Sequence, residues 1–172
     1  MLYNIFLFGT LRSEKIFKAV LNQPMHSFTI SSCIAKRAKL KKMKDENYPV
    51  LIRTEYDLDH VKGVVIHNLD KNFLKRILFF ESIEYKLDDI DVETKGDLTS
   101  VKYFALDQKQ VTSEDWIYAE WHKNWENWDY ECALVWMKYF NQFKNCPEEA
   151  EKLWPEMLNE IRVNFNKKHQ QI

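Results

Sequence analysis

The chain contains little glycine, proline or cysteine. Of its 172 residues, 3 are glycine, 4 are proline and 3 are cysteine. So few chain breakers, together with 45% hydrophobic and 15% aromatic residues, exclude a disordered or linker-rich protein. The cysteines are odd in number and have no CxxC spacing, so they fit a reducing compartment better than a disulfide framework: Cys33, Cys132 and Cys146.

An excess of one charge is also lacking. The formal net charge is -1, which argues against a general polyanion binder. One basic cluster, "AKRAKLKKMK" at residues 35–44, is expected to be a solvated strand and loop, and the alternative is a surface that tracks phosphates. We therefore do not expect a nucleic-acid partner.

The N-terminal apolar run, Leu2 to Phe8, is too short to cross a bilayer. No Lys or Arg precedes this run, and no small-residue cleavage site follows it. We therefore expect a cytoplasmic protein without a membrane partner.

Motifs for metals and common cofactors are missing as well. There is no HExxH pair, GxSxG elbow, P-loop or GxGxxG sequence. The five histidines have no paired ligand spacing: His26, His60, His67, His122 and His169. We expect neither a metal site nor a cofactor.

The first 110 residues are predicted to be rich in strands. The nearly continuous apolar run at residues 2–8 predicts a strand buried on both faces. Ser13 is the predicted cap of a following helix, and Asp70 caps a second helix over residues 70–81. Further extended segments are predicted at residues 27–44, 48–52, 62–69, 83–94 and 100–106, with a turn containing Gly96 between the last two.

From Val111 onward the pattern becomes helical, with Thr112 or Ser113 as the predicted cap. The aromatic residues suggest two helical stripes: Ile117, Trp121, Trp125 and Trp128, then Trp136, Tyr139, Phe140 and Phe143. Pro147 is predicted to begin a further helix. The predicted fold class is α+β, with a β-rich domain over residues 1–110 and flanking helices, and a helical C-terminal extension over 111–172 packed on it.

Gly9 lies directly after the first predicted strand. A glycine there serves either a tight turn that needs a positive φ or the close approach of another group to the backbone. A strand followed by a turn and a helix also exposes several amides in one place, where they can bind a carboxylate or a developing oxyanion. In so glycine-poor a chain we expect close approach as well as a turn, so that a substrate could reach the backbone.

Five segments follow one another at suggestive distances: "LFGTLR" (7–12), "YPVLI" (48–52), "VKGVVI" (61–66), "ILFFESIEYK" (77–86) and "VKYFAL" (101–106). In this order, the chain resembles the γ-glutamylcyclotransferase-like family, also called AIG2-like proteins, over residues 2–106. The resemblance implies a small mixed β-barrel with flanking helices that encloses a pocket at the first loop.

The resemblance also implies a site and an activity. The catalytic glutamate of the family corresponds to Glu81. The positions that bind the γ-glutamyl group or lie beside it correspond to Phe8, Gly9, Thr10, Leu11 and Tyr85. The implied activity releases 5-oxoproline from a γ-glutamyl amine or peptide by intramolecular cyclisation. The alternative is a non-catalytic small-molecule or protein-binding module of the same fold.

Acid–base chemistry explains why a buried carboxyl group suits this reaction. The α-amine of the substrate must lose a proton before it attacks, and the leaving nitrogen must gain one. Glu81 follows the apolar stretch "ILFF", and burial there would raise its pKa toward neutrality. The alternative is an exposed carboxylate paired with Lys75 or Lys86. Glu84 is the nearest rival, and we expect it to face solvent.

The sequence departs from the family pattern at four positions near these motifs. The family usually has Tyr, Asp, Gly and Arg, in that order, where this chain has Phe8, Leu78, Ser82 and Leu87. None of these changes removes Gly9 or Glu81, so the sequence allows activity, while the effect of the departures on it and the substrate's identity stay open. The β-carbon of Ser82 narrows backbone freedom beside the proposed base.

Overall fold

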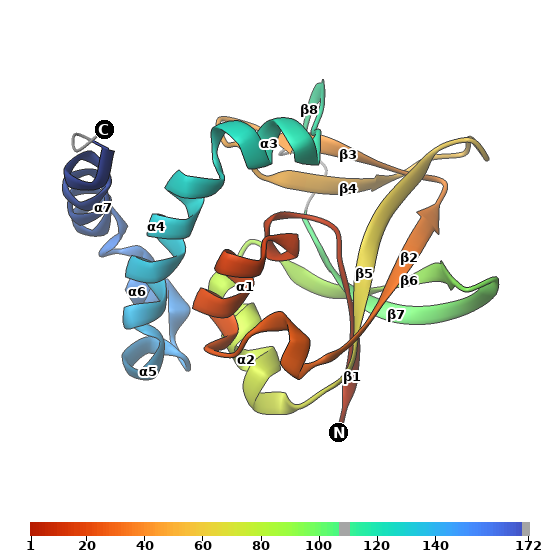
Figure 1. The fold of residues 1–172 in the computed structure, drawn as a ribbon, viewed down its shortest axis with the longest axis horizontal. Coiled ribbons are helices and arrows are strands. Elements are labelled where there is room, and N and C mark those ends of the chain that lie inside the picture. The colour runs from red at the N-terminus through yellow and green to blue at the C-terminus, as the bar shows by residue number, and fades with distance from the viewer. Residues whose placement is uncertain (107–110, 170–172) are drawn as a thin grey trace.

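A computed structural model describes residues 1–106 and 111–169 of the chain (Figure 1). In these two segments five strands close into a barrel in the order β1-β5-β2-β6-β7, and three more form a sheet in the order β4-β3-β8. The strands are β1 (Tyr3–Leu7), β2 (Thr29–Lys36), β3 (Ala38–Met43), β4 (Pro49–Arg53), β5 (His60–Leu69), β6 (Lys86–Thr94), β7 (Asp97–Ala105) and β8 (Val111–Asp115). The helices are α1 (Glu14–Leu21), α2 (Lys71–Glu81), α3 (Tyr118–Asn124), α4 (Glu126–Lys138), α5 (Phe140–Phe143), α6 (Pro147–Glu151) and α7 (Trp154–His169).

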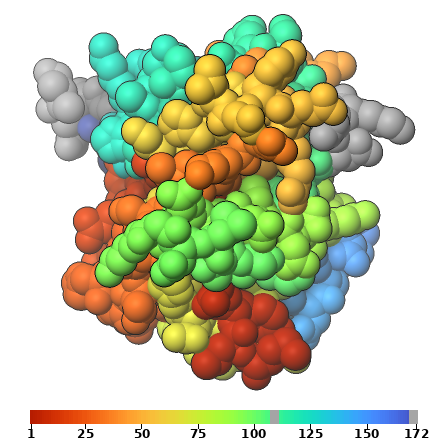
Figure 2. All heavy atoms as spheres, turned by 90° about the vertical axis from the view of Figure 1, so that its right-hand side faces the viewer, coloured from red at the N-terminus to blue at the C-terminus, as the bar shows by residue number. Residues whose placement is uncertain are grey.

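The barrel is mixed because β1 pairs antiparallel with β5 and parallel with β7. Strands β6 and β7 form a long antiparallel hairpin whose turn contains Gly96 at φ +94°. This hairpin crosses the face of the molecule opposite the helices (Figure 2). The predicted α+β fold with a small mixed barrel is confirmed.

Strand β1 lies between two cores, which explains its continuous apolar sequence. Successive side chains of a strand point to opposite faces. Phe6 and Phe8 therefore enter the core inside the barrel. Ile5 and Leu7 enter a larger core shared with the helices. The predicted strand buried on both faces is confirmed.

The two predicted helix caps near the barrel are also confirmed. Ser13 Oγ accepts a hydrogen bond from the Ile16 amide at 3.5 Å. Asp70 Oδ1 accepts hydrogen bonds from the amides of Asn72 and Phe73 at 2.7 and 3.1 Å. Helix α4 packs on α1, and α7 packs on the other side of α4 (Figure 1).

The helical prediction beginning at Val111 is wrong for its first five residues. Residues 111–115 form β8, which pairs antiparallel with β3. Thr112 Oγ1 donates a hydrogen bond to Lys42 O at 3.1 Å instead of capping a helix, and Ser113 lies within the strand. Lysines of β3 neutralise the acidic end of β8, since Lys41 pairs with Asp115 at 2.6 Å. Such cross-strand pairs stabilise a sheet.

The extended segment predicted over residues 27–44 is divided between two sheets. Arg37, at φ +53°, separates β2 in the barrel from β3 in the second sheet. The left-handed backbone at this residue turns the chain out of the barrel.

The predicted helical stripes are interrupted. The chain leaves helical geometry at Trp125, with φ -124° and ψ -20°, between α3 and α4. Trp121 is therefore 2% exposed, whereas Trp125 is 42% exposed. A second break at Tyr139 separates α4 from α5, and the helix predicted from Pro147 is divided into α6 and α7. The predicted domain boundary at residue 110 falls in segment 107–110, outside the described residues.

Gly63 in β5 is required by the close approach of β1. A Cβ atom at this position would lie 2.4 Å from the carbonyl oxygen of Leu7 and 2.4 Å from the ring of Phe6. The Leu7 backbone cannot move away without disturbing the pairing of β1 with β5, which also positions the loop after β1.

We expect Gly63→Ala to lower the free energy of unfolding by about 1–3 kcal/mol, as is usual for overpacking. Urea unfolding followed by tryptophan fluorescence measures this change. Lys62→Ala, at the exposed neighbour in the same strand, is the control and should change stability by about 0.5 kcal/mol or less. Equal stabilities for the two variants would contradict this explanation of Gly63.

Candidate active site

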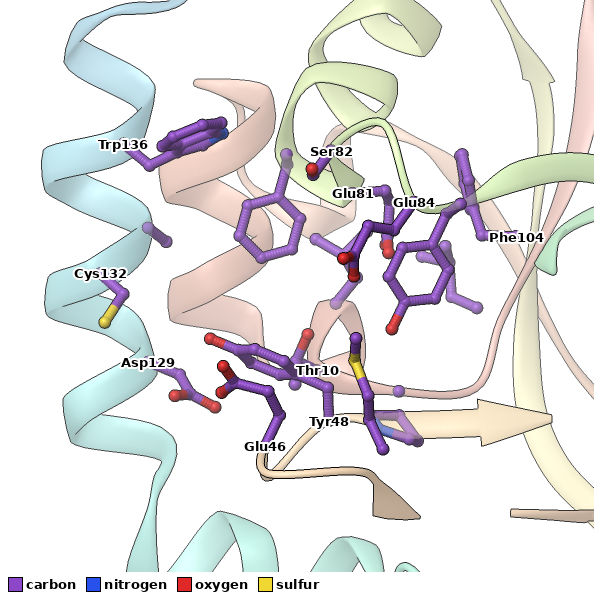
Figure 3. A pocket seen from close by; sticks show the side chains of 18 of the residues that line it. Thr10, Glu46, Tyr48, Glu81, Ser82, Glu84, Phe104, Asp129, Cys132 and Trp136 are labelled. Carbon is purple, nitrogen blue, oxygen red and sulfur yellow. The ribbon is translucent and has the colours of Figure 1, made fainter. Parts of the chain in front are cut away.

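A cavity of about 370 Å³ lies where the loop after β1, the end of α2 and helix α4 meet (Figure 3). The turn between β3 and β4 and helix α6 complete its wall. All six residues singled out in the sequence line this cavity: Phe8, Gly9, Thr10, Leu11, Glu81 and Tyr85. The fold therefore brings the first loop and the end of α2 together, and the roles of these residues stay predictions.

The loop after β1 forms a single 3-10 turn over Thr10–Arg12. The Arg12 amide donates to Gly9 O at 3.1 Å, and the Ser13 amide donates to Thr10 O at 3.0 Å. The amides of Gly9, Thr10 and Leu11 precede these bonds, so the turn itself does not use them. All three residues line the cavity.

Gly9 does not adopt a positive φ; its φ is -108°. The explanation of this glycine by a left-handed turn is therefore wrong. A Cβ atom at Gly9 would lie 2.7 Å from Cγ of Pro49, the first residue of β4. The glycine allows the "YP" segment to pack against the loop, so close approach is required by Pro49, whatever else reaches the backbone.

Thr10 and Phe8 have different environments in this loop. The Thr10 side chain is 8% exposed, its hydroxyl group points toward the cavity (Figure 3), and no other residue within 1–106 or 111–169 hydrogen-bonds to that hydroxyl. Phe8 is 6% exposed, and its ring packs against Phe6 and Tyr103 with centroids 5.6 and 6.3 Å apart. Phenylalanine at this position thus contributes to the barrel core. The Thr10 hydroxyl group borders the cavity and has no hydrogen-bond partner among the described residues, so it is available to a ligand.

Glu81 is the last residue of α2, and its carboxyl group points into the cavity (Figure 3). The residue is half-buried and lines the cavity. Burial raises its pKa from 4.5 to about 8. Within the described segments no lysine forms an ion pair with it, so neither Lys75 nor Lys86 neutralises the group.

Tyr85 and Glu84 border the cavity beside Glu81. Burial raises the pKa of the Tyr85 hydroxyl well above its ordinary value, and the carboxylates of Glu81 and Glu84 add to this effect. Glu84 is exposed, as expected, but its carboxyl group also faces the cavity (Figure 3).

Sequence reasoning left open how the C-terminal helices dock, and it did not identify the residues that α4 contributes to the wall. Four of its residues line the cavity: Asp129, Cys132, Ala133 and Trp136. Their i, i+3, i+4, i+7 spacing defines one helical face, and an acidic residue on an otherwise apolar face was the available signal. The thiol of Cys132 is not poised for nucleophilic attack, because burial raises its pKa to about 12.

Asp129 is 5% exposed, and its Oδ2 accepts a hydrogen bond from Trp121 Nε1 at 2.6 Å. Burial nevertheless raises its pKa to about 6, and the nearby Glu46 carboxylate acts in the same direction. Glu46 and Tyr48, from the turn between β3 and β4, were also missed and lie opposite Asp129 (Figure 3).

The lining is acidic. Among the described residues that line the cavity there is no Lys, Arg or His, and five carry carboxyl groups: Glu46, Glu81, Glu84, Asp129 and Glu151. These carboxyl groups are not arranged as a metal site, since no metal-binding group of three or more His, Cys, Asp or Glu occurs in the described segments. The side chain of His169 lies outside the described part of the chain.

The basic cluster at residues 35–44 is largely neutralised by acidic neighbours. Five of its six basic side chains form ion pairs at 2.5–3.1 Å: Lys36–Glu93, Arg37–Asp57, Lys39–Asp59, Lys41–Asp115 and Lys42–Glu114. This pairing favours the solvated strand over the phosphate-tracking surface. Across residues 1–106 and 111–169, no helix combines the length and apolar character needed to cross a bilayer.

Comparisons with known proteins agree with this architecture. Two solved structures of Arabidopsis thaliana proteins align with TM-scores of 0.56 and 0.54, at 16% and 18% identity; they cover 83% and 86% of this chain, and 85% and 91% of their own. A structure titled "Gamma-glutamyl cyclotransferase" aligns with a TM-score of 0.53 at 12% identity, over 95% of this chain and 99% of its own. At these identities the likeness concerns the fold. No curated protein sequence matches the chain.

A sequence family model identifies the family of the chain, which the structural matches do not. The model described as "Gamma-glutamyl cyclotransferase, AIG2-like" matches residues 5–125, which include both the first loop and Glu81. The match covers more than half of the chain and agrees with the mixed barrel. The chain therefore belongs to the AIG2-like gamma-glutamyl cyclotransferase family.

Proposed function

We propose that this protein releases 5-oxoproline from a γ-glutamyl amine or peptide, with Glu81 as the acid–base group. The observation that carries the proposal is the shared cavity, in which a carboxyl group with a raised pKa faces the amide-rich loop after β1. A cavity of about 370 Å³ is of a size that suits a small molecule.

The reaction needs no nucleophile from the protein. The substrate's α-amine attacks its own γ-carbonyl carbon, a new C–N bond closes the five-membered ring, and the original γ-amide C–N bond breaks. Holding the glutamyl chain in its folded rotamer makes this attack far more frequent, because the entropy of ring closure is lost on binding.

Glu81 would supply the proton transfers. A carboxyl group with a pKa of about 8 is present in both protonation states near neutral pH. Its ionised form takes a proton from the α-ammonium group, and its protonated form returns one to the leaving nitrogen. Burial thus gives one side chain both roles.

The loop would hold the charged and reacting oxygens. No basic side chain is found among the described lining residues, so the donors for the substrate's carboxylate or the developing oxyanion would be neutral groups. We assign this role to the main-chain amides of Gly9, Thr10 and Leu11 with the Thr10 hydroxyl; the hydroxyl groups of Tyr48 and Tyr85 also line the cavity. Tyr85 would close the cavity on the opposite side.

We expect Glu81→Gln to lower kcat for 5-oxoproline release by about 10²-fold or more, the usual contribution of a general acid–base group. In the unmodified protein kcat/KM should rise with pH through a limb near pH 8, because only the ionised carboxylate accepts the proton. Chromatographic assay of 5-oxoproline over pH 6–9 measures both.

Glu84→Gln, which changes a neighbouring carboxyl group of the same cavity, is the matched control and should retain the limb near pH 8. A Glu81→Gln variant with undiminished turnover would rule out Glu81 as the acid–base group. Saturable binding of γ-glutamyl compounds without any 5-oxoproline would instead support the binding-module alternative.

The acidic side chains that line the cavity favour one charge on the leaving amine over the other. Burial raises the pKa of both Glu46 and Asp129, and neighbouring carboxylates add to this effect: Glu84 and Asp45 for Glu46, and Glu46 for Asp129. A positively charged group on the leaving amine would relieve this repulsion, whereas a second carboxylate would add to it. We propose that the preferred leaving amine carries a cation.

At pH 8, kcat/KM should be higher for a γ-glutamyl diamine than for a γ-glutamyl dipeptide that ends in a carboxylate. One carboxylate at about 4 Å in a water-like setting contributes roughly 1 kcal/mol, or about fivefold. Asp129→Asn should narrow the preference by about this factor, whereas Glu148→Gln on the exposed surface of α6 should not. An unchanged preference in Asp129→Asn would contradict the assignment.

A further inference from the structure

Ser82, directly after Glu81, has a backbone conformation that normally requires glycine. Its φ is +65° and its ψ is -177°. Other non-glycine residues, such as Asn22 at φ +55° and ψ +27°, adopt the left-handed helical region. The combination at Ser82 lies in a region that is essentially restricted to glycine, so it persists only if neighbouring contacts hold it.

Those contacts come from Glu151, the last residue of α6. Ser82 Oγ donates a short hydrogen bond to Glu151 Oε1 and accepts one from the Ile83 amide at 2.6 Å. The same Glu151 oxygen lies 3.4 Å from the Ile83 amide nitrogen, which also donates to it. One carboxylate oxygen therefore fixes two consecutive residues after α2.

Helix α6 and the end of α2 are both anchored. Ala150, beside Glu151, has no exposed surface and belongs to the core shared by the barrel and helices. Trp136 of α4 donates its indole Nε1–H to Phe79 O at 2.9 Å, and the two rings stack with centroids 5.0 Å apart. Both α6, which carries Glu151, and the end of α2, which precedes Ser82, are therefore held in place by buried contacts.

We propose that Glu151 is a positioning residue, which holds Ser82 in its glycine-like conformation and so keeps Glu81 enclosed in the cavity. Ser82 sets the direction of the following residues, and two of them, Glu84 and Tyr85, line the cavity beside Glu81. If Ser82 relaxes to an ordinary conformation, this segment moves and water reaches Glu81. The proposal rests on the proposed function only where turnover is used as the readout.

The first test measures Glu81 directly, by carbon-13 NMR titration of its carboxyl group, assigned with Glu81→Gln. The titratable groups that share its cavity are Glu46, Tyr48, Glu84, Tyr85, Asp129, Cys132 and Glu151. In Glu151→Ala the pKa of Glu81 should fall by about one pH unit or more, a tenfold change in ionisation. Glu151→Gln, whose amide oxygen accepts the same hydrogen bonds, should retain most of the wild-type value.

A double-mutant cycle distinguishes positioning from a general loss of packing. Glycine adopts the Ser82 conformation without help. Therefore Glu151→Ala should shift the Glu81 pKa far less when it is added to Ser82→Gly than when it is made alone. A general loss of packing around Glu151 would instead shift the Glu81 pKa by the same amount with Ser82 and with Gly at position 82. Should Glu151→Ala fail to fold, Glu151→Asp, with a side chain one methylene shorter, provides the same comparison.

Turnover provides the second readout. Glu151→Ala should lower kcat about tenfold, leave KM nearly unchanged and move the limb of the pH profile toward lower pH, all relative to the wild type. Glu149→Ala is the matched control, because this exposed residue of α6 pairs only with Lys152 among the described residues and does not reach Ser82.

The two proposals can fail separately. A Glu81 pKa that is unaltered in Glu151→Ala, or equally altered in both Ser82 backgrounds, would overturn the positioning role even if the enzyme releases 5-oxoproline. A pKa that responds as expected in a protein without turnover would support the positioning role and overturn the proposed function.

Discussion

The site depends on keeping one carboxyl group away from bulk water. Glu81 has a pKa of about 8 in the folded protein, against an ordinary value of 4.5. Between these values the folded state retains a proton that the unfolded chain releases, so this residue makes folding less favourable as pH rises through that window. Strongly shifted carboxyl groups cluster at functional sites, which supports the proposed proton-transfer role of Glu81.

The rest of the structure encloses this group. The barrel fixes the loop after β1, and Gly9 allows Pro49 of β4 to pack against it, so two separate sequence motifs meet at one wall. The opposite wall comes from α4 and α6, whose lining residues, from Asp129 to Glu151, lie beyond the segment matched by the family model. The cavity thus combines a family barrel with a wall that belongs to the C-terminal helices.

Local sequence patterns predicted the parts of the fold that local physics determines. Strand β1, the caps at Ser13 and Asp70, and the β6–β7 hairpin follow from alternation, capping and turn residues. The family resemblance also placed Gly9 and Glu81 at one pocket; both residues line the same cavity, and their roles stay a proposal.

Contacts between residues far apart in the sequence could not be predicted from these local patterns. The sequence of residues 111–115 is typical of a helix start. These residues instead pair with β3, some seventy positions earlier, and lysines of β3 form ion pairs with their acidic side chains. The interruption between α3 and α4 at Trp125 could not be predicted, because the spacing of apolar residues continues through it with a helical period. The Ser82–Glu151 contact joins residues 69 positions apart, and no motif records it.

The most direct measurement of the central claim is a crystal structure of the protein with 5-oxoproline bound. The account predicts that the ligand lies in the cavity beside Thr10 and that its oxygen atoms accept hydrogen bonds from the amides of the loop after β1. Its ring nitrogen should lie within hydrogen-bond distance of the Glu81 carboxyl group. A ligand bound elsewhere on the molecule, or in the cavity with its nitrogen turned away from Glu81, would contradict the account.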